Sequence, residues 1–240
     1  MKSQTTRVSQ AIQKKQAKQA KQATPGQRTI NPNLVIIYLC ILFAFFISAF
    51  SYNLLPPTMI THWGLNGEAN GFSSKEMGLA IIPVLMTIII AVLYYLPKLD
   101  PFRKNMESIQ EEYQKFIAVF SGFMLYIQII VILLNLGIPL QIGVLFSPAF
   151  AALFYSVGNL IGKAKRNYFI GIRTPWTLSS DTVWDKTHKL GEKLFKGTAI
   201  LCIFGIILPN YFIILLLVPL IIGSIGLIIY SYKEYKKEQK

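Results

Sequence analysis

The chain has 240 residues, of which 53% are hydrophobic and only 15% are charged, and its mean hydropathy is +0.46. Such a composition excludes an ordinary soluble domain and predicts a protein embedded in a membrane. The formal net charge is +13, which in a soluble protein would favour binding to nucleic acid. Here the charge follows the distribution expected for membrane orientation, so we expect no direct binding to DNA or RNA.

Residues 1–32 form a tail that is rich in Lys, Gln and Ala and has almost no apolar anchors. We expect a disordered cytoplasmic tail that fixes the orientation of the protein. The alternative is a helix lying on anionic lipid, because clustered basic residues gain about 1 kcal/mol each near such a surface. The tail lacks the hydrophobic face that an interfacial helix uses, so we favour the disordered tail.

Five apolar runs meet or approach the roughly 20 residues that a membrane-spanning helix requires. They are residues 34–52, 77–96, 116–136, 140–161 and 211–230. A sixth run, residues 197–208, is short. It reaches spanning length if Leu194 and Phe195 join it and Lys196 extends its amine to the interface.

The basic residues decide between five and six spans, because Lys and Arg collect in cytoplasmic loops. With six spans, all of the 24 basic residues except Lys75 lie on the side of the two termini. Pro209 and Asn210 also break the last apolar stretch where a hairpin would turn. The sequence therefore predicts an all-α polytopic bundle of six transmembrane helices with cytoplasmic N- and C-termini.

The same topology divides the chain into parts. After the tail 1–32, residues 33–137 form an N-terminal membrane module of three spans with an external loop at 55–76. Residues 138–232 form a second module of three spans with a cytoplasmic loop at 162–196, and a basic tail follows at 233–240. The connector 98–115 reads as a surface helix under the membrane, because Ile109, Tyr113 and Phe116 recur at helical spacing.

The external loop is rich in Pro and Gly and is expected to be a series of turns, with Trp63 at the membrane interface. His62 invites a metal or acid–base role. The other histidine, His188, lies on the opposite side of the membrane in this topology, so the two cannot share a site. We therefore expect neither a catalytic nor a metal site, and no cofactor.

The apolar runs themselves contain no Asp, Glu, Lys, Arg or His. Ionisable groups inside a bilayer are costly and usually mark ion or proton pathways, so their absence argues against a proton-coupled transporter. Cys40 and Cys202 both fall within apolar runs and are expected to be buried thiols rather than a disulfide or a metal-ligand pair.

The most distinctive polar segment is residues 167–188, between the fourth and fifth spans. Thr174-Pro175 interrupts any helix there, and Ser179 or Ser180 can cap a new one. In the new helix an apolar stripe is predicted on one face, and ion pairs at i, i+4 on the other. The stripe is Val183, Thr187, Leu190 and Leu194, and the pairs are Asp185–Lys189 and Glu192–Lys196.

We expect this amphipathic helix to lie along the membrane and then turn into the fifth span, with Trp176 and Trp184 in an interfacial belt. Arg173 is a candidate for bonding to exposed carbonyls, or for a structural pair with Asp181 or Asp185. Asp181, Asp185 and His188 share a rough helix face. A capped, salt-bridged helix explains them better than a catalytic or metal site, because a nucleophile and a third strong ligand are missing.

The segment resembles the signature of the SdpI family of multispanning bacterial immunity proteins. The residues that carry the resemblance are Asn167, Gly171, Ile172, Arg173, Thr174, Pro175, Trp176, Thr177, Leu178, Ser179, Val183, Trp184, Thr187 and His188. The external loop is similar to a short module that precedes this signature in many members. Its matching residues are Pro57, His62, Gly67, Glu68, Gly71, Phe72, Ser74 and Lys75, with departures at Gly64, Ala69 and Asn70.

The resemblance covers about residues 33–232 and implies a multi-pass protein of the bacterial cell membrane that protects against a secreted peptide toxin. It also implies that the protein can hold a cytoplasmic transcriptional repressor at the membrane. The candidate partner contacts are His62, Trp63, Gly67 and Lys75 outside, and Asn167, Arg173, Thr174, Pro175, Trp176, Trp184 and His188 inside. Membrane lipids are the remaining expected partner.

Two other functions compete with this one. The first is a membrane-embedded enzyme that acts on lipid or cell-wall precursors, with His188, Asp185 and Arg173 as its site. The second is a small transporter, which is disfavoured because the apolar runs contain no ionisable residues.

Overall fold

The computed structural model describes residues 31–64, 68–139 and 141–240. The chain divides into two units, residues 1–32 and 33–240, and everything below concerns the second. The predicted basic tail and the candidate residue Gly67 lie outside the described residues.

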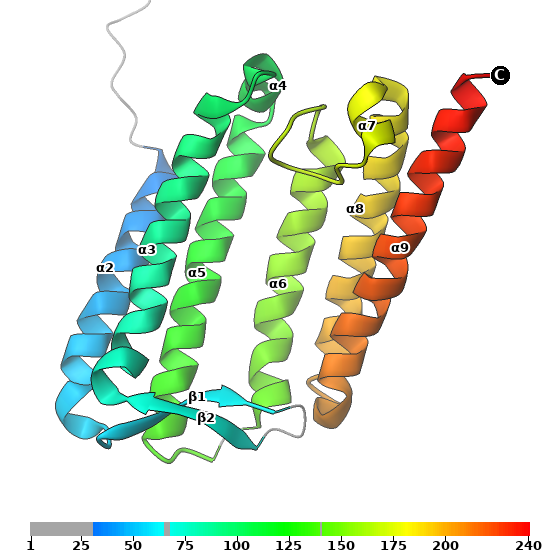
Figure 1. Ribbon diagram of the computed structural model, residues 1–240. Coiled ribbons are helices and arrows are strands. Elements are labelled where there is room, and N and C mark those ends of the chain that lie inside the picture. The colour runs from blue at the N-terminus through cyan, green and yellow to red at the C-terminus, as the bar shows by residue number, and fades with distance from the viewer. Residues whose placement is uncertain (1–30, 65–67, 140) are drawn as a thin grey trace, which may run out of the picture. The chain divides into compact units, whose positions relative to one another are not determined.

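Six long helices of the described chain run alternately in opposite directions across one bundle (Figure 1). They are α2 (Pro32–Ser51), α3 (Lys75–Leu99), α5 (Gln110–Asn135), α6 (Ile142–Lys163), α8 (Asp181–Phe204) and α9 (Phe212–Glu238). The shorter helices are η1 (Tyr52–Leu54), α4 (Arg103–Ser108), α7 (Pro175–Ser179) and η2 (Pro209–Tyr211). The prediction of an all-α polytopic bundle is confirmed.

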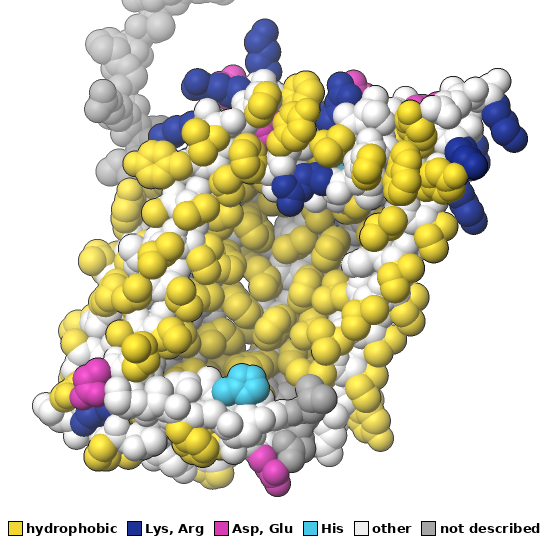
Figure 2. Space-filling view, viewed as in Figure 1, with side chains coloured by type: hydrophobic (Ala, Val, Ile, Leu, Met, Phe, Trp, Pro, Cys, Tyr) yellow, Lys and Arg dark blue, Asp and Glu magenta, His cyan; other side chains and the backbone are white. Residues whose placement is uncertain are grey.

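Five of the long helices are long and apolar enough to cross a membrane, as judged for the described residues by length and composition. These are α2 together with η1, α3, α5, α6, and α9 together with η2. Their outer faces carry many exposed large hydrophobic side chains, which Figure 2 shows as a broad apolar surface along the length of the bundle. Such a surface is typical of helices that contact lipid.

The two ends of the bundle differ in charge. The "loop end" carries α4, the segment 164–180 and the last turns of α9, and most of the Lys and Arg side chains in Figure 2 gather there. The "hairpin end" carries the turn after α2 and the β-strands, and its charged residues in the described chain are Glu68, Lys75 and Glu76. This asymmetry is the one that the predicted topology requires.

Helix α8 is continuous from Asp181 to Phe204, which differs from the predicted interfacial helix followed by a turn. Ser180 caps its first turn by accepting a hydrogen bond from Val183 N–H at 3.2 Å. The polar first half and the apolar run 197–208 therefore share one axis beside α6 and α9 (Figure 1). The polar first half lowers the hydropathy of α8, although its length of 24 residues matches that of the other long helices.

Close packing of α8 on α6 depends on Gly158 and Gly162, which are spaced as in the small-xxx-small motif of membrane helices. A Cβ atom at Gly158 would come 2.9 Å from Lys196 Cγ, and one at Gly162 would clash with the Glu192 carboxylate. Glu192 and Lys196 form the predicted ion pair, at 2.5 Å. This half-buried pair lies beside the last turns of an apolar helix, so the bundle does hold paired charges near its loop end.

The external loop contains an antiparallel hairpin that the sequence reading missed, formed by β1 (Thr58–Trp63) and β2 (Ala69–Ser74) with an irregular register. The side chain of Asn135, at the end of α5, forms hydrogen bonds with the backbone of β1 as a neighbouring strand would. Its Oδ1 accepts from Ile60 N–H at 2.7 Å, and its amide donates to Ile60 O at 2.9 Å. The hairpin is thereby fixed to the bundle rather than hanging from two turns.

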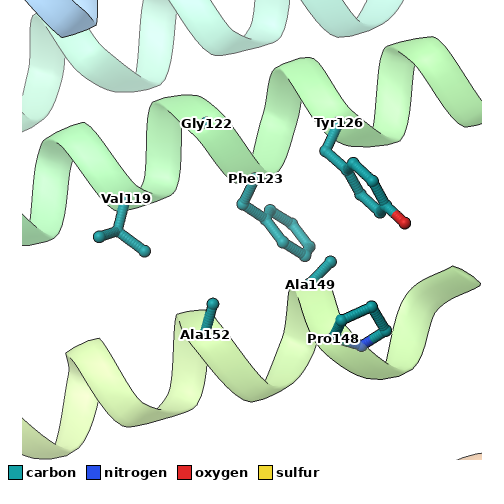
Figure 3. Close-up of a pocket in the computed structure, with 7 residues that line it drawn as sticks. All are labelled: Val119, Gly122, Phe123, Tyr126, Pro148, Ala149 and Ala152. Atoms are coloured by element: carbon teal, nitrogen blue, oxygen red, sulfur yellow. The ribbon is translucent and has the colours of Figure 1, made fainter. Parts of the chain in front are cut away.

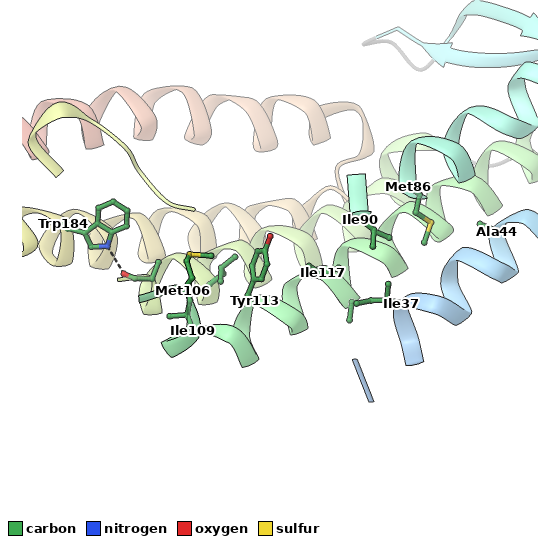
Figure 4. Close-up of a cluster of buried hydrophobic side chains, with 12 residues drawn as sticks. Ile37, Ala44, Met86, Ile90, Met106, Ile109, Tyr113, Ile117 and Trp184 are labelled. Atoms are coloured by element: carbon green, nitrogen blue, oxygen red, sulfur yellow. Dashed lines mark hydrogen bonds between the residues drawn. The ribbon is translucent and has the colours of Figure 1, made fainter. Parts of the chain in front are cut away.

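The largest apolar core joins α2, α3, α4 and α5 to the end of α6, the start of α8 and the segment 164–180 (Figure 4). Ile109 and Tyr113 are both buried in it. The connector 98–115 is therefore partly a core element, and not only a surface helix under the membrane as predicted.

Candidate functional site

At the loop end, Asn167 organises the turn that follows α6. Its side chain is fully buried and satisfies four backbone groups. Oδ1 accepts from the N–H groups of Phe169 and Ile170 at 2.9 and 2.6 Å, and Nδ2 donates to the carbonyls of Lys165 and Ile170 at 2.8 and 2.9 Å. An amide side chain with both donors and both acceptors used in this way is a structural clamp.

Gly171 brings the turn against α8. Its φ of +121° favours glycine, and an added Cβ would clash with His188 Nε2 and come 3.1 Å from Trp184 Cζ2. The next residue, Ile172, donates its N–H to His188 Nε2 at 3.0 Å. The turn therefore rests directly on the imidazole ring.

His188 is 1% exposed and stacks on Trp184 with ring centroids 3.9 Å apart. Its Nδ1 lies 2.8 Å from Trp184 O. Because Nε2 accepts from a backbone N–H and Nδ1 faces a carbonyl, the ring is neutral with its proton on Nδ1. Burial lowers the pKa of His188 to about 4.

Trp184 is fully buried and donates from Nε1 to Ala164 O at 2.8 Å, the bond drawn dashed in Figure 4. The prediction of an interfacial Trp184 is therefore wrong. Its indole closes the space between the end of α6 and the start of α8, so one face of the first turns of α8 is buried in the protein. Of the predicted apolar stripe, Val183 and Thr187 are buried, whereas Leu190 is exposed.

Thr174 and Thr177 form a reciprocal capping box at the start of α7. Thr177 N–H donates to Thr174 Oγ1 at 3.2 Å, and Thr174 N–H donates to Thr177 Oγ1 at 2.9 Å. Pro175 occupies the first helical position, where its missing N–H costs nothing. Thr174 Oγ1 also lies 3.1 Å from Ser231 Oγ on α9, and Trp176 packs on Tyr232. These contacts tie the segment to the last helix.

A second set of contacts joins the segment to the connector after α3. Asp100 is 4% exposed and accepts from the N–H groups of Phe102 and Tyr168 at 2.7 and 2.9 Å. The rings of Phe102 and Tyr168 stack at 5.5 Å, and Asn105 Nδ2 donates to Arg166 O at 2.7 Å. Sequence reasoning missed Asp100, because nothing local marks a carboxylate whose partner lies 68 positions away.

Asp181, Asp185 and His188, which were predicted to share a rough helix face, have separate partners. His188 faces Gly171 and Ile172, Asp181 Oδ1 lies 2.8 Å from Arg166 Nε, and Asp185 Oδ1 lies 3.6 Å from Lys165 Nζ. The predicted pair of Asp185 with Lys189 is thus replaced by one across the turn. The described residues contain no group of three or more His, Cys, Asp or Glu placed to hold a metal ion.

Arg173 follows one of its two predicted roles. It is exposed and donates to Tyr168 O at 2.6 Å, whereas Asp181 and Asp185 pair elsewhere. The proposed enzyme site of His188, Asp185 and Arg173 is therefore not assembled, because each residue faces a different neighbour.

At the hairpin end, a cavity of about 870 Å³ lies between the two halves of the bundle. It is lined by Thr61, His62, Trp63, Gly64, Ile82, Ile127, Val131, Gln141, Ile142, Gly143, Phe146, Pro209, Asn210, Phe212 and Ile213. We call it the hairpin cavity. Helices α3 and α5 together with β1 form one wall, and α6, η2 and α9 form the other. Most of the lining is apolar, with polar side chains added near the chain turns.

His62 and Trp63 both line this cavity. His62 is exposed, and its Nδ1 lies 2.6 Å from Asn70 Oδ1 across the hairpin. Lys75 does not line it. Its amine lies 4.3 Å from the centre of the Tyr52 ring and donates to Leu55 O at 3.4 Å, so Lys75 fastens the turn after α2 instead.

A smaller pocket of about 300 Å³ lies between α5 and α6, where Phe123 and Tyr126 face Pro148, Ala149 and Ala152 (Figure 3). Its lining is almost entirely apolar, and the one hydroxyl present, on Tyr126, donates to Leu145 O at 3.1 Å. This pocket offers a ligand no polar anchor.

Comparison with known proteins places this chain in a family. Residues 163–231 match the family described as "SdpI/YfhL protein family", and residues 39–87 match a domain of unknown function, DUF1648. The Immunity protein SdpI of Bacillus subtilis (strain 168) is 30% identical over 213 residues, which cover 84% of this chain and 94% of that protein. The chain belongs to the SdpI family. No solved structure matches it.

As a member of the SdpI family with five apolar membrane-length helices, the chain is a multi-pass protein of the bacterial membrane. The SdpI match begins at the end of α6 and ends within α9, so it contains the whole segment 164–180. The family resemblance carried by that segment is confirmed. The module boundaries 33–137 and 138–232 stay predictions, with the two matches falling inside them.

In this SdpI-family chain the signature residues of the loop end mostly build one rigid turn. Asn167, Gly171, Thr174, Trp184 and His188 contact each other or the backbone, and are buried or half-buried. Arg173 and Trp176 reach the surface. The hairpin cavity lies at the opposite end of the bundle.

Proposed function

We propose that this chain is an integral membrane immunity protein that protects the cell against a secreted peptide toxin. The relative that covers most of the chain is named an immunity protein. The observation that carries the proposal is the hairpin cavity, which lies at the weakly charged end of the bundle, where a secreted peptide would arrive.

This proposal includes the six-span topology. Five helices satisfy the length and hydropathy of a membrane span, and α8 runs parallel to them as the sixth. With α8 crossing, α2 begins and α9 ends on the same side, and the Lys and Arg of the loop end lie in the cytoplasm. The hairpin end, with the cavity, then faces outwards.

The lining of the cavity suits a segment of an amphipathic peptide. Trp63, Phe146 and Phe212 offer apolar and aromatic surface, while Gln141 and Asn210 stand at the turns of the second module. A volume of 870 Å³ falls in the range of ligand pockets and accommodates several side chains rather than a whole peptide. Binding there would withdraw the apolar segment of a toxin from the lipid it attacks.

We also propose that the loop end can hold a cytoplasmic transcriptional repressor. The exposed cations Lys165, Arg173, Lys189 and Lys193 give this end a basic surface around a rigid turn. A soluble partner with an acidic face would be attracted to it. The test is whether such a repressor sediments with membranes only when this protein and its toxin are both present.

The immunity proposal is tested by expressing the chain in a toxin-sensitive bacterium and measuring survival against toxin concentration. Ile213→Trp fills the hairpin cavity from α9, whereas Ile222→Trp places the same side chain on the exposed, lipid-facing surface of that helix. We expect protection by the wild type and by Ile222→Trp, and loss of protection by Ile213→Trp at equal membrane abundance.

Unchanged killing of cells that carry the wild-type protein would remove the immunity function for that toxin. Full protection by Ile213→Trp would instead leave the function standing and remove the cavity as its site. The two outcomes are therefore separable in one set of strains.

A further inference from the structure

A groove of about 430 Å³ lies at the loop end, between the segment 172–176 and helices α8 and α9. It is lined by Ile172, Arg173, Thr174, Pro175, Trp176, Phe195, Ser224, Leu227 and Ile228. Ser224 and Ile228 are exposed on α9, so the groove opens towards the lipid-facing side of that helix. We call it the α8–α9 groove.

Arg173 lies at the loop side of this groove, and most of its N–H donors are not used within the described residues. The guanidinium has five N–H donors, and among the described residues its one hydrogen bond is the donation to Tyr168 O at 2.6 Å. Within the described part of the chain it forms no ion pair with a carboxylate. An exposed arginine in this state is ready to bind an anion, and its planar fork matches a phosphate group.

The rim beside Arg173 has the composition of a membrane interface. Trp176 packs on Tyr232 with ring centroids 5.0 Å apart, and Lys236 Nζ lies 4.9 Å from the centre of the Tyr232 ring. Trp and Tyr concentrate at the level of lipid headgroups, and Lys and Arg near that level attract anionic lipids. Below this rim, Phe195, Leu227 and Ile228 make the wall of the groove apolar.

We propose that the α8–α9 groove binds an acidic phospholipid of the inner leaflet. Its phosphate is held by Arg173 at the rim, and one acyl chain lies along Phe195, Leu227 and Ile228. A soluble anion would use only the first of these features, whereas a phospholipid uses both. The bound lipid bridges the segment 172–176 to α9, next to the bond between Thr174 and Ser231, and so stabilises the turn from outside. The inference rests on the proposed orientation of the loop end, and not on toxin binding.

The test uses the full-length protein reconstituted with a 1:1 mixture of phosphatidylglycerol and phosphatidylcholine. After extraction in mild detergent, native mass spectrometry measures how much of each lipid stays bound. Arg173→Gln removes the charge and leaves the groove, whereas Ser224→Phe fills the groove and leaves the charge. Lys104→Gln, at an exposed cation on α4 that does not line the groove, is the matched control.

The wild type and Lys104→Gln are expected to retain phosphatidylglycerol in preference to phosphatidylcholine. Arg173→Gln should lower that preference about tenfold, because one charge-assisted contact contributes roughly 1.5 kcal/mol or more. Arg173→Lys should keep part of it, which separates a lost charge from a disturbed turn. Ser224→Phe should retain little of either lipid.

Equal preference in Arg173→Gln and the wild type would overturn the proposal, as would unchanged retention in Ser224→Phe. A further arm adds inorganic phosphate at 10-fold excess over lipid. Displacement of the lipid by phosphate would show a site for the free anion and would also overturn the lipid assignment, whereas unchanged retention supports it.

Discussion

The contact between Gly171 and His188 gives the sharpest prediction about the loop end. Replacing Gly171 by Ala puts a Cβ atom where the imidazole Nε2 lies and 3.1 Å from Trp184 Cζ2, on a backbone with φ of +121°. His188 is fixed by its stack on Trp184 and by Trp184 O, so it cannot move aside without losing these contacts. The hydrogen bond from Ile172 N–H at 3.0 Å is then broken.

The expected loss of unfolding free energy is the sum of two contributions. A buried N–H left without its acceptor costs about 1–3 kcal/mol, and a side chain held at this φ costs about 1–3 kcal/mol more. We expect Gly171→Ala to lower the free energy of unfolding by about 3 kcal/mol or more. In a chain of this size that corresponds to a fall of about 6–12 °C in the melting midpoint.

The assay is thermal unfolding in detergent or nanodiscs, followed by tryptophan fluorescence. Gly197→Ala is the matched control, because Gly197 lies inside α8 and a Cβ there meets nothing within 4 Å. That control should be neutral or slightly stabilising, by up to about 1 kcal/mol. An equal midpoint for Gly171→Ala and Gly197→Ala would refute the reasoning.

A second background separates the clash from backbone strain. In a His188→Ala protein, the imidazole is absent, so adding Gly171→Ala should cost less than it does in the wild type. The same cost in both backgrounds would mean that the imidazole contact is not the cause.

Three further predictions follow from described contacts. Burial lowers the pKa of His188 to about 4, from an ordinary value near 6.5. The free energy of unfolding should therefore be full above pH 6.5 and fall by about 3 kcal/mol as the pH drops to 4. The same dependence on pH in a His188→Gln protein would contradict this. Asp100→Ala should speed amide hydrogen exchange at Phe102 and Tyr168 and lower the free energy of unfolding by about 2–4 kcal/mol. Asp185→Ala, which breaks an exposed ion pair, should lower it by less than about 1 kcal/mol. Equal effects of the two substitutions would contradict the structural role of Asp100. In a protein with Cys40 and Cys202 replaced, a cysteine at Asn53 should react with an impermeant thiol reagent in intact cells, and one at Ser108 only after permeabilisation; the reverse pattern would overturn the proposed orientation.

The bundle could be predicted from the sequence because lipid imposes a simple rule on it. Runs of apolar residues set the helices, and the distribution of Lys and Arg sets their alternation. The capping by Ser180 and the turn at Thr174-Pro175 also follow from local chemistry, and the structure has both. These features depend only on neighbours in the chain.

The features that were missed depend on distant partners. The role of Asp100 requires Tyr168 N–H, and that of Asn135 requires the edge of β1. Trp184 was placed at the interface because tryptophan is common there, whereas in the structure its N–H is satisfied by Ala164 O in a closed space. The polar start of α8 was expected to lie flat because its paired charges suit an aqueous surface. Instead, the glycines of α6 let the Glu192–Lys196 pair pack against a neighbouring helix.

The hairpin cavity could not be predicted for a related reason. Its walls come from both modules, and the chain reaches it from β1, α3, α5, α6, η2 and α9. The sequence singled out His62 and Trp63 from their loop alone. It gave no sign that Phe146 and Ile213, inside apolar runs, share a cavity with them.

The central claim is that the hairpin cavity receives a segment of a secreted peptide toxin. Its most direct test is photo-crosslinking in intact cells, with a benzophenone side chain placed at Gln141 in the cavity lining or at Asn53, which is exposed at the same end outside the cavity. The account predicts a covalent adduct between the toxin and the Gln141 variant, lost on adding Ile213→Trp, and little or none with the Asn53 variant. Equal adducts from both positions, or an adduct at Gln141 that persists when Ile213→Trp fills the cavity, would contradict it.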